Sequence, residues 1–202
     1  MKISEEYLLG LGACRPAIKL WLDKPETDPL ICIVKLEKID KHDYAAWLLA
    51  KLMTPTNAAK FAIYAAKKVL SVFEAEYPND NQPRKAIQAA KRVLKNPTKE
   101  NIYVAGRAGN NTWKTLLKSN GLAFIACRSS EYAVFAAKQA ALFAKNSGYY
   151  DDHDDHYGHG ADAADRAAIA ANCAIHAKPT EGKKIVRYGK ILIRKQLKGG
   201  AN

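Results

Sequence analysis

The segment 148–165, GYYDDHDDHYGHGADAAD, contains the side chains with the widest choice of chemistry in this chain. Aspartate oxygens and histidine nitrogens together can bind manganese, iron or zinc, and aspartates alone suit calcium. His153, His156 and His159 recur at every third residue, a spacing that one face of a helix can use. The calcium-loop pattern fails, because the sixth position counted from Asp151 is His156, where that loop requires glycine.

Two glycines in the same segment, Gly158 and Gly160, disfavour a continuous helix, and nothing in the spacing determines a ligand count. A solvated loop between two helices explains the composition most simply, while a metal site and an acidic patch that binds a partner stay open as alternatives. We assign no metal ligand and no cofactor. The candidate partner-contacting residues of this segment are Asp151, Asp152, His153, Asp154, Asp155, His156 and His159.

Catalytic motifs are missing from the rest of the chain. It has no GxSxG, no GxxxxGK[ST] and no strand-bound GxGxxG. The glycines of GRAGNN, residues 106–111, lie within a helical pattern, where a helix break or close packing explains them. His42 and His176 are isolated, which indicates hydrogen-bonded histidines rather than bases. The four cysteines form no CxxC pair and are expected to be reduced and buried, so we predict that the protein is not an enzyme.

The net charge of +12 is concentrated in two segments. Residues 83–95 carry five basic and no acidic side chains, and residues 183–198 carry seven and none. Such surfaces suit an anionic partner without identifying it, although a helix face that is simply charged and solvated is the plainer interpretation. The candidate anion- or partner-binding residues are Arg84, Lys91 and Lys95 in the first segment, and Arg187, Lys190 and Arg194 in the second.

Helical periodicity dominates the elements that would position these residues. Helices are predicted over 41–53, over 55–77 after Thr54, from Pro83 to 95, from Thr98 to near Gly121, from Ser130–Glu131 to 146, and over 162–177. In the helix that begins near Ser130, the inward stripe comprises Ala133, Ala136, Ala137, Ala140, Phe143 and Ala144. Residues 29–36 fit a strand or a buried helix. Residues 185–197 favour a helix with Leu197 in its apolar stripe, although Gly189 and the isoleucines would also suit a strand.

Alanine contributes little burial per residue, so alanine-lined helices must approach closely to exclude water. The sequence therefore predicts an all-α fold: a single domain over residues 1–202, built as a bundle of about seven to nine closely packed helices, with 183–198 as a basic C-terminal segment. No run approaches the roughly 18 apolar residues that span a bilayer. The N-terminus lacks a signal-peptide core, so we expect the cytoplasm of a cell or of a virus-infected host cell.

Four stretches carry a resemblance to a known family: ACRPAIKLW near the start, HDYAAWLLAKLM, YPNDNQPRKAIQAAKRVL, and the alanine-rich second half. Together they resemble the alanine-rich family of putative immunity proteins found in bacterial polymorphic-toxin neighbourhoods and in phage genomes. The most specific stretch is Tyr77–Leu94, where the pattern YPxDxxPRxAIxAA starts a helix, and a weaker likeness extends over most of residues 10–177. The Asp/His segment and the basic tail depart from the family pattern.

The resemblance implies a non-enzymatic helical protein that neutralises another macromolecule by stoichiometric contact. The partner would be a toxin or, for a phage protein, a host defence factor. Surface charge would guide the approach, and a few buried anchors would supply affinity. A basic nucleic-acid-associated protein is the second hypothesis, and a metal-dependent hydrolase built on residues 151–159 is the third. The expected partner is thus a protein, with nucleic acid as the alternative and no membrane.

Overall fold

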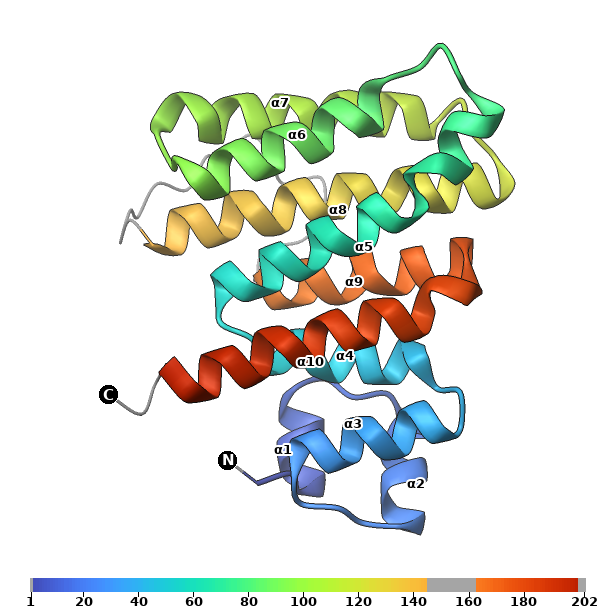
Figure 1. The fold of residues 1–202 in the computed structure, drawn as a ribbon, viewed down its shortest axis with the longest axis vertical. Coiled ribbons are helices and arrows are strands. Elements are labelled where there is room, and N and C mark those ends of the chain that lie inside the picture. The colour runs from blue at the N-terminus through green and yellow to red at the C-terminus, as the bar shows by residue number, and fades with distance from the viewer. Residues whose placement is uncertain (1, 145–162, 200–202) are drawn as a thin grey trace.

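The computed structural model describes residues 2–144 and 163–199, and every regular element in them is a helix (Figure 1). In chain order they are α1 (Glu5–Gly10), α2 (Arg15–Asp23), α3 (Pro29–Lys38), α4 (His42–Leu52), α5 (Pro55–Glu76), α6 (Gln82–Lys95), α7 (Lys99–Leu116), α8 (Gly121–Ala144), α9 (Ala163–Ala177), the short 3-10 helix η1 (Pro179–Glu181) and α10 (Gly182–Gly199). The predicted all-α class is confirmed. The three short N-terminal helices bring the described α-helices to ten, against the seven to nine predicted.

The two segments that fitted either a strand or a helix are both helical. The side chain of Asp28 caps α3 by accepting the N–H of Ile31 at 2.9 Å, and Pro29 takes the first helical position. In α10 the helical spacing buries Ile185 and Leu192 on one side. Local capping and the period of the apolar residues therefore outweigh the β-branched composition of these segments.

The boundary between α7 and α8 lies elsewhere than predicted. Helix α7 ends at Leu116, and α8 begins at Gly121 rather than near Ser130. Gly121 has a φ of +50°, which glycine adopts without the steric cost of a side chain. Within α8, the neighbouring Ser129 is buried and donates its hydroxyl to the Ala170 carbonyl of α9 at 2.8 Å. A helix start was predicted near Ser130–Glu131. This prediction was wrong because Ser129 and Ser130 lie buried inside α8 instead of capping it.

Small residues allow the helices at the centre to approach closely. Helix α5 packs against α4, α6, α8, α9 and α10, and α8 packs against α5, α6, α7 and α9. Helix α7 is continuous through Gly106 and Gly109, and a Cβ added at Gly109 would lie 3.0 to 3.1 Å from the side chains of Phe135 and Val134 in α8. Close packing, rather than a helix break, is therefore the reason for glycine at this position.

Several apolar side chains and cysteines that were predicted to be buried are exposed or only partly buried. Phe143 is 72% exposed, and Ala144 and Leu197 are also exposed, because each lies near the end of its helix, beyond the reach of the helices that cover the rest of the stripe. Cys32 and Cys127 are buried as expected. Cys173 is only partly buried, and Cys14 is exposed, since it precedes the first turn of α2. The cysteines of the chain are unpaired.

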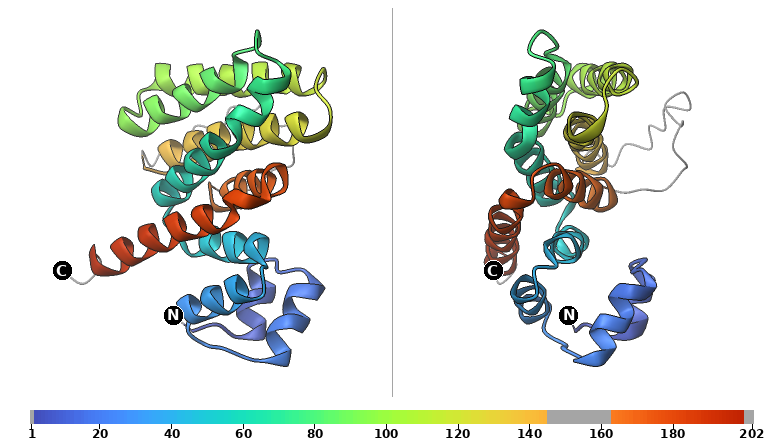
Figure 2. Two further views of the ribbon diagram at one scale, coloured as in Figure 1. Left: turned by 45° about the vertical axis from the view of Figure 1, so that its right-hand side comes forward. Right: turned by 90° about the vertical axis from the view of Figure 1, so that its right-hand side faces the viewer.

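The arrangement in space puts the two basic helices on one face of the molecule. Helices α6, α5 and α10 succeed one another on the viewer's side in Figure 1, and the turned view in Figure 2 shows α7, α8 and α9 behind them. Helices α1 to α3 form the end of the molecule that lies beyond α10, and α4 packs against α10 and α9. None of the described helices is long and apolar enough to cross a membrane.

Candidate partner-binding surface

Helix α10 carries a row of four cations on one side. Lys183, Arg187, Lys190 and Arg194 follow one another at steps of four, three and four residues, which the 3.6-residue helical repeat brings onto a single face. The side turned to the protein is apolar and includes Ile185, Val186, Leu192 and Ile193. Burial of this apolar side therefore orients Lys183, Arg187 and Arg194 outward, whereas Lys190 is largely buried.

Close contact with the core holds α10 in place. A Cβ added at Gly189 would lie 2.8 Å from Cδ1 of Leu49 in α4 and 3.0 Å from Cε2 of Phe61 in α5. Beside it, the ring of Tyr188 stacks on Tyr64 of α5 with centroids 4.1 Å apart and an interplanar angle of 15°. Gly189 is thus a site of close helix approach and not the sign of a strand.

A carboxylate anchors the beginning of α10. Glu181 in η1 is buried, and its oxygens lie 3.0 Å from Nζ of Lys184, 3.7 Å from Nζ of Lys68 and 3.9 Å from Nζ of Lys178. The hydrogen bond from Lys184 is the main reason that the pKa of Glu181 lies below its ordinary value. These contacts join the start of α10, where the cation row begins, to α5 and to Lys178, which follows α9.

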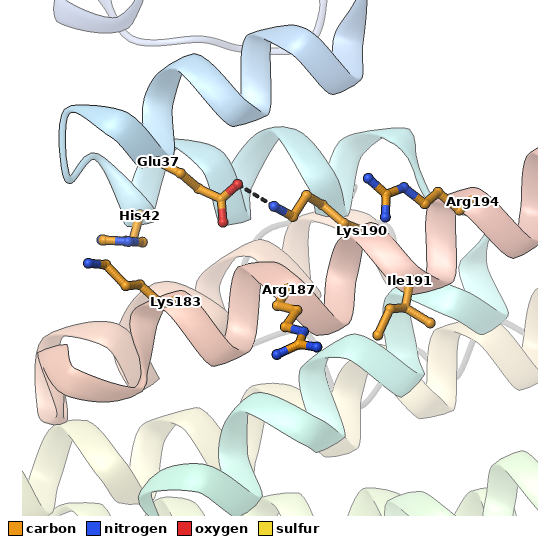
Figure 3. Close-up of a pocket in the computed structure, with 7 residues that line it drawn as sticks. All are labelled: Glu37, His42, Lys183, Arg187, Lys190, Ile191 and Arg194. Atoms are coloured by element: carbon orange, nitrogen blue, oxygen red, sulfur yellow. Dashed lines mark hydrogen bonds and ion pairs between the residues drawn. The ribbon is translucent and has the colours of Figure 1, made fainter.

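The cation row borders a pocket of about 470 Å³ between α10, α3 and α4 (Figure 3). Its lining residues are Glu37, His42, Lys183, Arg187, Lys190, Ile191 and Arg194. Glu37 is the one carboxylate in the lining, and it forms an ion pair with Lys190. The other cations of the lining make no ion pair with any described residue, so the pocket attracts anions.

His42 begins α4 at one end of this pocket. The side chain is 9% exposed, and its Nε2 atom has no hydrogen-bond partner among the described residues. A Cβ added at Gly182 would lie 3.2 Å from both Cβ and Cγ of the imidazole, so the first residue of α10 packs directly on the ring. The expectation of a hydrogen-bonded histidine was wrong for this ring nitrogen, because no polar group of α3, α4 or α10 reaches it.

The structure thus brings the candidate residues Arg187, Lys190 and Arg194 together beside one pocket. The lining adds Lys183, Glu37 and Ile191, which were not among the predicted site residues, and His42, which was expected to be a hydrogen-bonded histidine without a role in a site. Lys183 could have been found from its place four residues before Arg187. Glu37 and His42 carry no such signal, because they come from α3 and α4 and reach the pocket only through the packing of α10.

The other predicted basic residues lie on α6, away from the pocket. Arg84, Lys91 and Lys95 are all exposed. Arg84 donates from Nε and Nη2 to the two carboxylate oxygens of Glu74 in α5 at 2.7 and 2.8 Å. Partial burial and then the nearby Lys67 of α5 lower the pKa of Lys91, so two like charges lie side by side there. The α6 surface is therefore separate from the α10 row, with α5 between them (Figure 1).

The candidate residues of the Asp/His segment, Asp151 to His159, lie outside the described residues. In the part of the chain that the structure does describe, no group of three or more His, Cys, Asp or Glu side chains could hold a metal ion.

Comparison with known proteins gives one match. Residues 48–103 match the family described as Imm-5 like putative immunity protein. The matched range runs from α4 through α5 and α6 into α7, and it contains the Tyr77–Leu94 stretch on which the resemblance mainly rested. The resemblance is confirmed over this range. No curated protein and no solved structure matched. The pocket lining lies outside the matched range, whereas the basic residues of α6 lie inside it.

Proposed function

From the match of residues 48–103 to an immunity-protein family, we propose that this chain is an immunity-like binding protein without catalytic activity. It neutralises a toxin or, if it is encoded by a phage, a host defence factor, by stoichiometric protein–protein contact. The contact surface on this chain is the cation row of α10 with its pocket. We assign the contact to this surface because four cations and only one carboxylate line the pocket.

Charge complementarity supports an acidic protein surface as the partner. The row from Lys183 to Arg194 spans about 16 Å along the helix, at 1.5 Å per residue. Arg187 and Arg194 are exposed and make no ion pair with described residues, so binding breaks no existing pair at these positions. Exposed arginines at an interface offer bidentate hydrogen bonds to carboxylates, and clustered charge of one sign raises the association rate. The pocket beneath the row provides a cavity for a partner side chain.

We also propose that this surface binds its partner without catalysing a reaction. The polar groups around the pocket are cations, one carboxylate and one histidine, and the carboxylate is already engaged by Lys190. Cations can bind and orient an acidic group without changing it chemically. The surface therefore suits an inhibitor that occupies its partner, and the Asp/His segment remains a second candidate contact on the sequence prediction alone.

Affinity capture from the native host tests this proposal. Tagged wild-type protein should retain one protein partner in a constant molar ratio, measured by mass spectrometry and by light scattering of the purified complex. The double charge reversal R187E/R194E should weaken that complex at least about tenfold, which is the range expected for losing charged anchors. The control K195E/K198E changes the net charge equally on exposed residues of α10 that do not line the pocket, and it should retain the partner.

Two outcomes would contradict the proposal. If nuclease treatment removes the captured material, the partner is nucleic acid and the basic nucleic-acid-associated alternative is correct. If both double variants lose the partner equally, net charge matters but the pocket does not. Turnover of the captured partner by the wild-type protein would overturn the non-enzymatic assignment.

A further inference from the structure

The unpartnered imidazole of His42 distinguishes one end of the pocket from the rest. A buried polar group without a hydrogen-bond partner is rare in folded proteins and often marks a place that a ligand fills. The Nε2 atom of His42 meets this description among the described residues, and the side chain lines the pocket. The packing of Gly182 against the ring keeps the imidazole in this position. A ring held in place with a free nitrogen is a preorganised hydrogen-bonding group.

The charged groups and the helix N-terminus around His42 favour the binding of a negatively charged ligand. Lys183, on the first turn of α10, lines the same pocket as His42 and directly follows Gly182, which packs on the side chain of His42. Helix α4 begins at His42, and its N-cap residue Lys41 provides no side-chain hydrogen bond to the N–H groups of the first turn. Two carboxylates oppose this effect: Asp43, which follows His42, and Glu37, which is held by Lys190. The lining of the whole pocket has four cations and one carboxylate, so an anion is the favoured ligand.

We propose that His42 and Lys183 form a subsite for a single oxyanion, and that the oxyanion is a carboxylate from an acidic side chain of the protein partner. The source of the carboxylate rests on the proposed function, whereas the subsite itself does not. In the complex, Nε2–H of His42 and the Lys183 amine donate to the two oxygens of one carboxylate. The remaining cations of the row then contact neighbouring acidic groups of the partner.

Access to the imidazole requires a side chain to move. The Nε2 atom is covered in the unbound protein, so an incoming oxygen reaches it only after a group at the pocket edge rotates. Lys183 is exposed and has a long, flexible side chain, so its rotation requires no change in the backbone. The amine that moves aside is then free to bind the second oxygen.

Nuclear magnetic resonance of the full-length protein tests the subsite directly. Long-range proton–nitrogen spectra report the imidazole nitrogens of the five histidines, and the variant H42F identifies the His42 signals by their loss. Sodium acetate and sodium phosphate are titrated separately at constant ionic strength maintained with sodium chloride. We expect saturable shifts of the His42 nitrogens with both anions. K183Q should weaken the apparent affinity about fivefold, as expected for one lost charged contact.

K195Q is the matched control, because it removes the same charge from an exposed position of α10 that does not line the pocket. Its titration should equal that of the wild type. Shifts that follow ionic strength alone, or that are the same in K183Q and in the wild type, would overturn the subsite. K183Q changes an exposed side chain, so this comparison does not depend on the folding of H42F.

Partner capture separates this inference from the proposed function. Loss of the partner in both H42F and K183Q, with retention in K195Q, supports a carboxylate from the partner as the ligand. If the wild type and both variants retain the partner equally while acetate and phosphate still bind, the subsite takes a free anion and the partner-derived carboxylate is wrong. If no protein is captured at all, the proposed function fails, and the titration still decides the subsite.

Discussion

The Lys190 amine of α10 donates a hydrogen bond to the carboxylate of Glu37 in α3, 153 residues earlier in the chain. This ion pair crosses the pocket in Figure 3 and joins the last helix to the N-terminal end of the molecule. Both side chains are largely buried, so the pair is shielded from solvent on most sides. The pair also neutralises one cation of the row, so Glu37 weakens the attraction of the pocket for anions.

Removing this carboxylate should strengthen anion binding. We expect E37Q to bind immobilised heparin more tightly than the wild type, by about two- to fivefold, because Lys190 becomes free. The free energy of unfolding should fall by about 1–3 kcal/mol, between the values for an exposed pair and for a fully buried one, because this pair is largely buried. Salt elution from heparin and urea unfolding measure the two effects. The control E100Q removes an equal charge from exposed α7, and an equal gain in retention there would contradict the prediction.

Exchanging Gly189 for alanine should loosen α10. The added methyl group would overlap Leu49 and Phe61, which are fully buried and have little room to move. Overpacking of this kind costs about 1–3 kcal/mol. The matched variant G10A adds a methyl group where no atom lies within 4 Å, and it should leave stability unchanged or slightly higher. Urea unfolding of both variants checks the prediction, which fails if G189A unfolds at the same urea concentration as G10A.

Stability should depend on pH through Glu131. Burial in α8 raises the pKa of this carboxyl from 4.5 to about 7, while Arg128 and Arg166 act in the opposite direction. Between these two values the folded protein keeps a proton that the unfolded chain releases. The free energy of unfolding therefore falls as pH rises from about 4.5 to 7, and this contribution is constant above that. The total loss is about 3 kcal/mol at 1.36 kcal/mol per pKa unit.

The variant E131Q isolates this contribution, because glutamine has the same shape and no titrating proton. Its stability should lack this fall between pH 4.5 and 7, and it should exceed that of the wild type at pH 8. E100Q, with an exposed carboxyl, should keep the wild-type dependence. Urea unfolding at a series of pH values measures the effect. An unaltered slope in E131Q would show that another group is responsible.

Binding to nucleic acid should be weak and non-specific. Both basic helices lie on one face, so duplex DNA should be retained at low salt and released at moderate salt. R187E/R194E and K91E/K95E should reduce this retention by similar amounts, because each pair removes general positive charge. Fluorescence anisotropy over a salt series measures the affinities. Binding at physiological salt with a Kd below about 1 μM, abolished by one pair alone, would favour the nucleic-acid hypothesis instead.

Local signals in the sequence predicted most of the helices well. Thr54 and Thr98 each accept an N–H from three residues on and cap α5 and α7, as their positions indicated. Such caps act over one turn, so neighbouring residues are enough to recognise them. The α7–α8 boundary shows the limit of this reasoning. A helix start was predicted near Ser130, yet Ser130 and its neighbour Ser129 are buried inside α8, where Ser129 donates its hydroxyl to the Ala170 carbonyl of α9.

By itself, the sequence determined the all-α class, the concentration of basic side chains that includes residues 187, 190 and 194, and the resemblance that the match of residues 48–103 confirms. These properties depend on helical period and local composition, which can be read from adjacent turns. Only the tertiary structure decided that His42 and Glu37 meet the α10 row. Their positions follow from the close approach of α10 at Gly189 and Gly182, a contact between helices that lie far apart in the chain.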